Sequence, residues 1–254
     1  MHIVGTGFLA GEFRRIADRH DDVALLAAGV SATMATSQEP FQREADLLYR
    51  CLDECRTRGS RLVFFSTAST GMYSRSGREG REDGPIQPTT AYGRHKLAME
   101  AVIRSSGVDH LILRLAHVVG RRQRPHLLLP ALVTQVVNGR VQLHRQACRD
   151  VIDIDDVVGI VDRLLNRGTG RTVVNIASGI ATPVERIVDH IADRLHLDPE
   201  RVFVAGSPNP PISLARLRRL VPAVRECGFD DGYYRRVLDK YIDSCVPAAV
   251  RRVD

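Results

Sequence analysis

The segment Met1-His-Ile-Val-Gly5-Thr-Gly7-Phe-Leu-Ala10-Gly-Glu12-Phe-Arg-Arg-Ile-Ala17 decides the fold. Its first residues are apolar and predict a strand, Gly5 to Gly7 predict a tight turn, and Glu12 to Ala17 predict a helix. Together they form a phosphate-binding device, because glycines let backbone N–H groups approach a pyrophosphate and a helix N-terminus favours negative charge. The spacing is Gly-x-Gly-x-x-Ala, with Ala10 at the place of the usual third glycine. An ordinary tight strand–helix turn is the alternative interpretation.

Downstream, the chain alternates between buried strands and amphipathic helices, which predicts an α/β fold with a doubly wound parallel sheet. Its 254 residues are enough for one large domain with a smaller lobe. The expected strands are 23–29, 61–65, 110–115, 141–143, 171–177 and 201–204, and the expected helices are 41–56, 92–105, 126–138, 157–165 and 183–195.

A tyrosine and a lysine stand four residues apart in Tyr92-Gly-Arg-His-Lys96, on a predicted helix. This spacing puts both side chains on one face. A lysine ammonium lowers the pKa of a nearby phenol by favouring the phenolate, and such a phenol can exchange a proton with a sugar or alcohol oxygen. Only Lys96 and Lys240 are lysines among 36 Lys+Arg residues, which favours a specific need for a compact charge at Lys96. An exposed helix with an incidental aromatic residue is the alternative.

A row of hydroxyl groups follows the buried strand 61–65, in Ser66-Thr67-Ala68-Ser69. In an α/β fold the carboxyl ends of parallel strands face the ligand crevice. These hydroxyls are therefore candidates for contact with a ligand, whereas an ordinary Ser/Thr turn is the structural alternative.

Composition restricts the class of protein. The formal net charge of +6 and a pI near 9.4 permit nucleic acid, but the arginines are scattered and aromatic residues are only 5 %, so no stacking platform is indicated. We expect no membrane span, no secretory leader and no metal site. The five cysteines are odd in number and widely spread, which predicts free thiols in a reducing cytosol.

Seven segments, in order, resemble the extended short-chain dehydrogenases/reductases of the NAD-dependent epimerase/dehydratase type, which act on nucleotide sugars. They cover residues 1 to about 195, and the resemblance is strongest to short nucleotide-sugar 4-ketoreductases of deoxysugar biosynthesis. The matching segments are Gly5-Thr-Gly-Phe-Leu-Ala10, Leu25-Leu-Ala-Ala-Gly29, Phe65-Ser-Thr-Ala-Ser69, Tyr92-x-x-x-Lys96, Arg114-Leu-Ala-His-Val-Val-Gly120, Arg149-Asp150 with Asp155-Asp156, and Val174-Asn-Ile-Ala-Ser-Gly179.

The resemblance implies a role for each matching residue. Tyr92 would be the catalytic acid/base, Lys96 would lower its pKa and hold the nicotinamide ribose, and Ser69, with Thr67 as second choice, would hydrogen-bond the reacting oxygen. Expected cofactor contacts, besides Tyr92 and Lys96, are Gly5, Gly7, Phe8, Leu9, Ala27, Ala28, Gly29, Ser66 and Ala116. Expected substrate contacts are His117, His126 and Arg149, the last gripping the sugar nucleotide's diphosphate with its guanidinium fork.

The chain departs from the family pattern between the first helix and Val23, where roughly two strand–helix units are missing. The acid that usually binds the adenosine ribose is therefore absent. Arg14 or Arg15 could serve a 2′-phosphate, which favours NADP(H) over NAD(H), but the same gap would suit a protein that has lost cofactor binding. Thr70-Gly71 after Ser69 replaces the acidic pair of the dehydratases, so a dehydratase is not expected.

We therefore predict a truncated Rossmann-type cofactor domain at 1–180 and a small substrate lobe at 181–254, with 121–149 contributing. The expected reaction is NAD(P)H-dependent reduction of a keto group on a nucleotide-linked deoxyhexose, with dTDP as the expected nucleotide. Its expected partner is a nucleotide-diphosphate sugar, and a homodimer is allowed. An epimerase with tightly bound NAD and a non-catalytic dinucleotide-binding protein are the alternatives.

Overall fold

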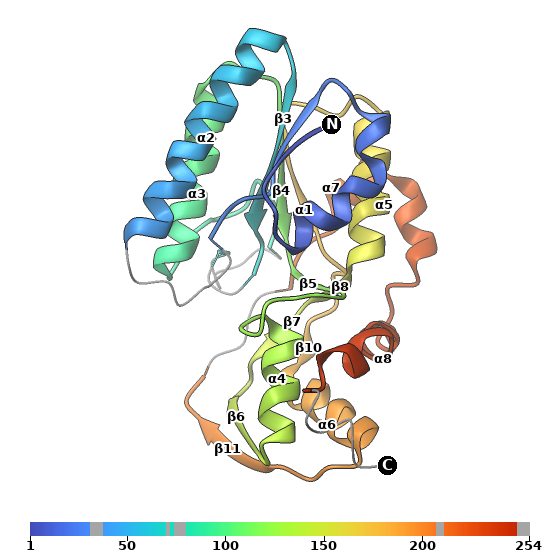
Figure 1. Cartoon of the computed structure of the whole chain (residues 1–254). Coiled ribbons are helices and arrows are strands. Elements are labelled where there is room, and N and C mark those ends of the chain that lie inside the picture. Colours follow the sequence, from blue (N-terminus) through green and yellow to red (C-terminus); the bar gives the residue numbers. More distant parts are fainter. Residues whose placement is uncertain (31–37, 70–71, 74–79, 207–210, 248–254) are drawn as a thin grey trace.

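A five-stranded parallel sheet forms the centre of the larger domain (Figure 1). The computed structural model describes residues 1–30, 38–69, 72–73, 80–206 and 211–247. The strand order is β1-β2-β3-β4-β9, so the four strands from β1 to β4 lie side by side in chain order. The strands are β1 (His2–Val4), β2 (Val23–Leu26), β3 (Arg61–Thr67), β4 (His110–Leu115) and β9 (Thr172–Ile176). The predicted α/β architecture is confirmed.

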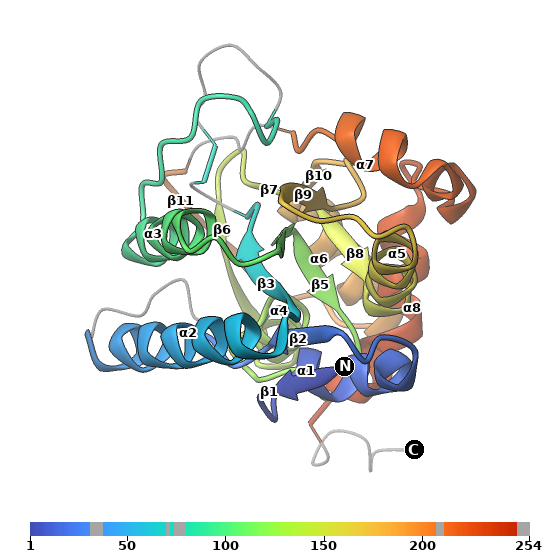
Figure 2. The ribbon, with the colours of Figure 1, turned by 90° about the horizontal axis from the view of Figure 1, so that it is seen from above.

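Helices cover both faces of this sheet (Figure 2). Residues along each strand alternate between the two faces, so Leu26 of β2 packs toward α2 and α3, whereas Leu25 packs toward α1 and α5. Both faces are therefore apolar, as a parallel sheet requires. The covering helices are α2 (Gln38–Arg58) and α3 (Ala91–Ser105) on one face, and α1 (Phe8–Phe13), the 3-10 helix Arg14–Arg19 and α5 (Ile154–Asn166) on the other.

The connection from β1 to β2 has the opposite hand to the two connections that follow it. Strands β1 to β4 succeed one another across the sheet, so crossovers of a single hand would place every connecting helix on one face. Yet Phe13 and Ile16, in the first connection, pack into the core on the α5 face, away from α2 and α3. Because about 98 % of such crossovers are right-handed, the β1–β2 connection is the exceptional left-handed one.

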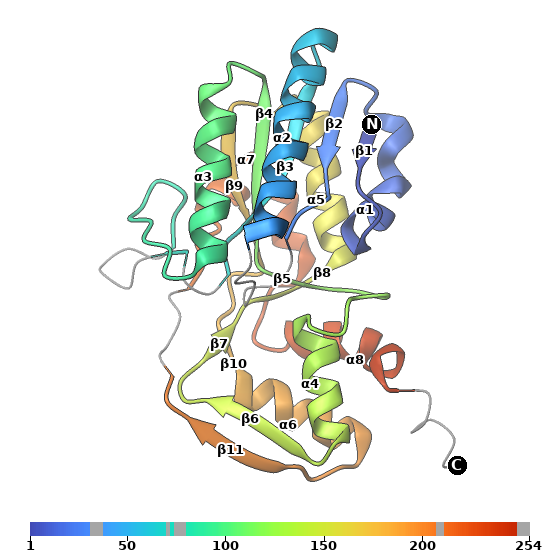
Figure 3. The ribbon, with the colours of Figure 1, turned by 60° about the vertical axis from the view of Figure 1, so that its left-hand side comes forward.

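A second lobe lies beyond the carboxyl ends of the strands (Figure 3). In it α8 packs against α4 and α6, and β6 pairs in parallel with β11. The lobe contains α4 (Leu128–Val137), β6 (Arg140–His144), β7 (Cys148–Arg149), β10 (Thr182–Pro183), α6 (Val184–Leu195), β11 (Glu200–Val204) and α8 (Tyr233–Cys245). A parallel pair, β5 (His117–Val119) and β8 (Val151–Asp153), runs between lobe and sheet.

One C-terminal segment accompanies the larger sheet. Helix α7 (Ala215–Leu220) contacts β9, and the 3-10 helix Pro222–Cys227 packs on α7. Cys51, Cys55 and Cys227 are free thiols within the described structure, as predicted for them. Within the described residues, no helix is both long and apolar enough to cross a bilayer.

Candidate active site

Helix α3 presents Tyr92 and Lys96 at the carboxyl end of β3. The helix begins after Thr90, whose hydroxyl accepts a hydrogen bond from the Gly93 N–H at 3.0 Å and so caps its N-terminus. Lys96 Nζ lies 5.8 Å from the centroid of the Tyr92 ring. The structure therefore brings together the phenol and the ammonium group that their spacing predicted.

Lys96 is buried in an ion pair with Glu44 of α2. Their side chains are 4 % and 1 % exposed, and Lys96 Nζ donates to Glu44 Oε1 at 2.5 Å and to the Phe65 carbonyl at 3.0 Å. The second carboxylate oxygen accepts from the Val30 N–H at 3.0 Å and lies 3.2 Å from His95 Nε2. Sequence reasoning missed Glu44. The available signal was an acid on the apolar face of its helix, in line with Leu48, Cys51, Leu52 and Cys55.

Glu44 changes the electrostatics that the Tyr92–Lys96 spacing suggested. Burial raises the pKa of Tyr92, the Lys96 charge lowers it, and the Glu44 charge raises it again, so the net direction is upward. For Glu44, burial alone would raise the pKa, but Lys96, His95 and the Val30 amide outweigh burial and bring it down to about 2. Tyr92 is therefore held in its protonated form, in contrast to the activated phenolate that the spacing alone predicted.

Two hydroxyls stand beside Tyr92. Thr67, the last residue of β3, is hydrogen-bonded to the Tyr92 phenol, and its Oγ1 lies 2.6 Å from Ser69 Oγ. The Thr67 hydroxyl also accepts from the Ser69 N–H at 3.0 Å. Thr67 therefore makes the direct contact with Tyr92, and Ser69 extends the chain of hydroxyls. Ser66 is turned the other way and donates to Glu100 Oε1 at 2.5 Å, which leaves only its backbone for a cofactor contact.

A buried ion pair holds α3 against the sheet behind these residues. Arg114 of β4 is fully buried and donates to both oxygens of Glu100, at 2.9 Å from Nε and 2.7 Å from Nη2. Glu100 stands one helical turn after Lys96. Because this fork fixes both the helix and the strand, it positions Lys96 and Tyr92 over the end of β3.

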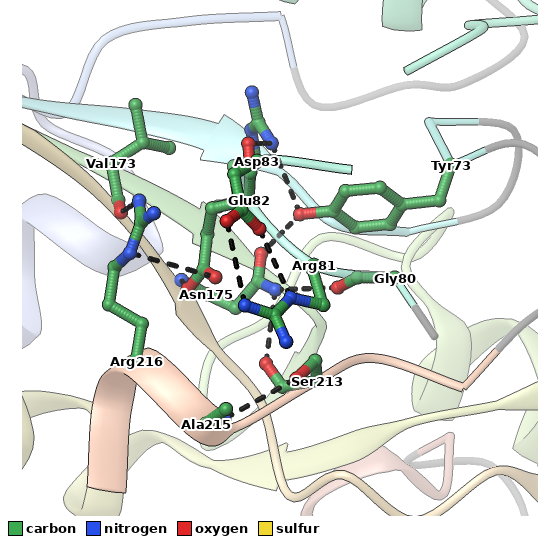
Figure 4. Close-up of polar contacts among 11 residues, drawn as sticks. Tyr73, Gly80, Arg81, Glu82, Asp83, Val173, Asn175, Ser213, Ala215 and Arg216 are labelled. Carbon is green, nitrogen blue, oxygen red and sulfur yellow. Dashed lines mark hydrogen bonds and ion pairs between the residues drawn. The ribbon is translucent and has the colours of Figure 1, made fainter. Parts of the chain in front are cut away.

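The same network continues to β9 and to the C-terminal segment, as Figure 4 shows. The Tyr73 hydroxyl bonds Asn175 Oδ1, and Asn175 Nδ2 donates to the carbonyls of Gly80 and Ser213 at 2.9 and 3.1 Å. The Asn175 N–H donates to Glu82 Oε1 at 2.9 Å. The segments around residues 80 and 213 are thereby tied to the edge of the sheet.

The glycine turn lies where β1 meets α1. Gly5 has a φ of +133°, and a Cβ there would lie 2.7 Å from the Ala27 carbonyl oxygen, so this glycine lets the turn approach the end of β2. A Cβ on Gly7, the N-cap of α1, would meet nothing within 4 Å. The backbone N–H groups of Gly7, Phe8 and Leu9 at this open turn fit an incoming phosphate.

The small residues after β2 fit closely around the ion pair. Ala27 and Ala28 follow the strand, and the Ala27 N–H donates to the Val4 carbonyl at 2.9 Å. At Gly29 a Cβ would lie 2.7 Å from Glu44 Oε1 and 3.1 Å from Lys96 Nζ. Gly29 therefore leaves room for the buried charges, a reason for the glycine that the sequence alone did not indicate.

His117 and Arg149, two of the predicted substrate contacts, approach one another at the β5–β8 and β7 strands. Burial and the Arg149 charge lower the pKa of His117 to about 3, so its imidazole is neutral. Its Nδ1 is buried and has no partner within the described part of the chain. Burial lowers the pKa of Arg149, whose Nη1 donates to the Cys148 carbonyl at 2.8 Å. No carboxylate among the described residues pairs with Arg149, so its charge is open to an anion.

The other predicted contacts lie apart from this pair. Ala116 is buried and donates its N–H to the Ile176 carbonyl at 2.9 Å, at the end of β4. His126 is exposed, two residues before α4. Arg15, one of two candidates for a 2′-phosphate, donates to Asp155 of α5 at 2.7 Å and pairs with Glu12 at 3.2 Å. Arg14 is exposed and remains the only one of the two without a described ion pair.

A parallel α/β sheet with a glycine turn and a Tyr-x-x-x-Lys pair places this protein among the short-chain dehydrogenases/reductases. More narrowly, the chain belongs to the NAD dependent epimerase/dehydratase family, whose sequence model matches residues 10–177. Members of this family and superfamily are NAD(P)-dependent enzymes, and the family confirms the predicted resemblance.

Curated relatives include the dTDP-6-deoxy-L-talose 4-dehydrogenase (NAD(P)(+)) of Kitasatospora kifunensis, 28 % identical over 186 residues, which are 68 % of this chain and 58 % of the relative. The dTDP-glucose 4,6-dehydratase of Streptomyces griseus is 28 % identical over 114 residues, 42 % of this chain and 35 % of the relative. The matches thus span less than two thirds of either relative's length.

Solved structures share the fold. RMD from Pseudomonas aeruginosa, complexed with NADPH, has a TM-score of 0.75 at 18 % identity and covers 96 % of this chain and 98 % of its own. MoeE5 in complex with UDP-glucuronic acid and NAD has a TM-score of 0.74 at 21 % identity, and the match covers 94 % of this chain and 84 % of MoeE5.

Proposed function

We propose that this protein reduces the C4 keto group of a nucleotide-linked 6-deoxyhexose, with dTDP as the nucleotide, in a deoxysugar pathway of the kind that serves antibiotic biosynthesis. The observation that carries the proposal is the contact of a protonated Tyr92 with Thr67, beside a Lys96 whose charge Glu44 compensates. A phenol kept protonated suits proton donation, which reduction requires. The similarity to a dTDP-6-deoxy-L-talose 4-dehydrogenase supports the substrate class.

In this proposal the turn amides of Gly7, Phe8 and Leu9 bind the cofactor pyrophosphate. Lys96 Nζ donates two of its three protons to Glu44 and to the Phe65 carbonyl, and the third is donated to the nicotinamide ribose. When bound, the reduced cofactor supplies a hydride to the carbonyl carbon. Thr67 or Ser69 hydrogen-bonds the carbonyl oxygen, and Tyr92 gives its hydroxyl proton to that oxygen as the negative charge develops. With that hydride and the Tyr92 proton, the keto group would become a secondary alcohol.

The substrate contacts follow from charge. Arg149, which has no described carboxylate partner, would bind the diphosphate through its guanidinium fork. The neutral imidazole of His117 would offer its buried Nδ1 to a sugar hydroxyl. Asp150 between them is committed to Ser178 and Gly179, from which it accepts three hydrogen bonds at 2.8 Å.

NADP(H) stays the favoured cofactor in this proposal, with NAD(H) as the alternative. Because Arg15 is paired, Arg14 alone would serve a 2′-phosphate. Turnover of NADPH with a nucleotide sugar is cytosolic chemistry, and we propose that compartment.

The test is reduction of dTDP-4-keto-6-deoxyglucose by the purified protein with NADPH or NADH, followed by cofactor absorbance and by the mass of the product. We expect cofactor oxidation matched by formation of a dTDP-6-deoxyhexose, and a fall in kcat of about 100-fold or more in Tyr92→Phe. The matched control is Tyr49→Phe, which changes an exposed tyrosine on α2 and should leave kcat at the value of the parent protein. Protein that purifies with NAD and consumes no reductant would establish the epimerase instead, and full activity in Tyr92→Phe would refute the catalytic assignment.

A further inference from the structure

The sheet retains one of the two halves from which a dinucleotide-binding fold is built. Such folds join two mononucleotide-binding halves, and the dinucleotide lies across the point where the strand order reverses. Here β2, α2, β3, α3 and β4 form one half, and β1 pairs directly with β2. Within the described residues β1 is the edge of the sheet (Figure 3). The second half is thus reduced to β1 and its helix.

The chain topology that a pyrophosphate crevice requires is nevertheless present at β1 and β2. After β1 the chain enters α1 on one face of the sheet, and after β2 it enters α2 on the other face. Two adjacent parallel strands whose connections leave toward opposite faces open a crevice at their carboxyl ends. On the β2 side of that crevice stand Lys96, proposed above to bind the nicotinamide ribose, and Tyr92 and Thr67, proposed above to contact the reacting oxygen.

On the β1 side, the connecting segment is turned away from the crevice. Arg19 and His20 both bond Asp162 of α5, at 3.0 and 2.8 Å, and Arg15 bonds Asp155. These contacts bind the segment to the α5 face.

The acids of this region lie at the wrong end of the sheet for an adenosine ribose. Asp21 and Asp22 precede β2, and the Asp22 carbonyl accepts from the Arg61 N–H, where β3 begins. Because β1, β2 and β3 are parallel, this is the amino end of the strands, whereas the glycine turn follows the carboxyl end of β1. Asp21 is also 95 % exposed. Neither acid can bind a ribose whose pyrophosphate lies on that turn.

We propose that this protein recognises its cofactor through the nicotinamide mononucleotide half and gains little affinity from the adenylate half. The proposal rests on the proposed function, since it assumes that the cofactor is a reduced nicotinamide nucleotide. Arg14, exposed and without an ion pair among the described residues, adds only a screened surface charge, which changes the affinity for NADPH by about fivefold at most. NADPH therefore binds at most about fivefold more tightly than NADH, and reduced nicotinamide mononucleotide binds nearly as well as either.

Binding is tested by calorimetric and fluorescence titration of the whole chain with four ligands, which are NADPH, NADH, reduced nicotinamide mononucleotide and 2′-phospho-ADP-ribose. We expect the dissociation constant of the mononucleotide to lie within about tenfold of that of NADPH, and 2′-phospho-ADP-ribose to compete with neither. Lys96→Met should weaken NADPH and the mononucleotide by the same factor, while Arg14→Ala should change the affinity for NADPH by about fivefold at most.

The possible failures are distinct. If NADPH binds more than a hundredfold tighter than the mononucleotide, or if 2′-phospho-ADP-ribose displaces it, the half-site is wrong and the proposed reductase stands. If NADPH binds more than a hundredfold tighter than the mononucleotide only at concentrations where the protein dimerises, a second copy of the chain supplies the adenosine side of the site. The proposal for the single chain is then again wrong. If no nicotinamide ligand binds, this inference and the proposed function fail together.

Discussion

Replacing Glu44 with glutamine tests whether the buried carboxylate stabilises the fold by neutralising Lys96. Gln keeps the shape of the side chain and removes its charge. The ammonium group would then stay buried with the Phe65 carbonyl, 3.0 Å away, as its remaining polar partner. A buried charge that loses its counter-ion is costly because the attraction between the two charges no longer offsets the hydration that burial removed.

The magnitude follows from the pKa of Glu44. Folding lowers it from the usual 4.5 to about 2, and each pH unit corresponds to about 1.4 kcal/mol, so the ionised carboxylate contributes about 3 kcal/mol. Breaking a buried ion pair typically costs about 3–5 kcal/mol, which agrees. We therefore expect Glu44→Gln to lower the free energy of unfolding by about 3 kcal/mol at pH 7.

The pH dependence has a definite sign. Because the pKa of this acid is lower in the folded state, its stabilisation is complete above about pH 4.5 and is lost as the pH falls toward 2. Urea unfolding at a series of pH values should show a constant difference in unfolding free energy between parent and Glu44→Gln from pH 7 to about 5. Near pH 3 the difference should be roughly half that size.

Glu39→Gln is the matched control on the same helix. The Glu39 side chain is 84 % exposed, and its Oε1 lies 3.5 Å from Arg43 Nη1. Loss of the Glu39 charge should therefore change the unfolding free energy by no more than about 0.5 kcal/mol. The double variant Glu44→Gln/Lys96→Met should be more stable than Glu44→Gln alone, since it removes the orphaned charge. If Glu44→Gln lowers the unfolding free energy no more than the control does, or if its effect does not change with pH, the carboxylate does not stabilise the fold by neutralising Lys96.

Three further outcomes follow from the same contacts. In Glu44→Gln the uncompensated ammonium should lower the pKa of Tyr92, so the alkaline limb of the pH–kcat profile for keto reduction should move to lower pH. Arg114→Met should cost about 3–5 kcal/mol in urea unfolding because it leaves a buried carboxylate unpaired, whereas the exposed Arg121→Met should cost little; equal effects would contradict the positioning role. Burial raises the pKa of Asp150 to about 6, so the folded state takes up a proton below that pH, and the parent should gain stability relative to Asp150→Asn as the pH falls from 7 to 5. An unchanged difference between these two proteins would show that Asp150 titrates normally.

The sequence predicted the sheet because burial on both faces leaves a clear pattern. Segments such as Leu62-Val-Phe-Phe65 are apolar without alternation, and a parallel strand covered by helices must be so. The Tyr92–Lys96 pair was predictable for the same kind of reason, since residues four apart on a helix share a face. These inferences use only local periodicity and the rule that strand ends carry the site.

Glu44 and Arg15 show where such reasoning ends. An acid on an apolar helix face, such as Glu44, predicts a buried partner. That partner, Lys96, is 52 residues away in the sequence, and only the packing of α2 on α3 brings the two together. The missing acid makes Arg14 or Arg15 a candidate for a 2′-phosphate, yet the direction of the Arg15 side chain depends on the face to which the connection crosses. The hand of that connection brings Asp155, 140 residues later, within 2.7 Å.

That unusual hand has a physical consequence for the site. A right-handed β1–β2 crossover would place α1 on the same face as α2, and both connections would then leave the sheet on one side. Diverging connections are what open a crevice at the ends of two adjacent parallel strands, so the common hand would not provide one at β1 and β2. The β1–β2 pairing keeps the glycine turn beside Ala27, and the rare direction of the crossing keeps α1 on the face away from α2. Phe13 and Ile16, buried at 0 % and 5 % exposure on the α5 face, supply apolar burial that stabilises the crossing.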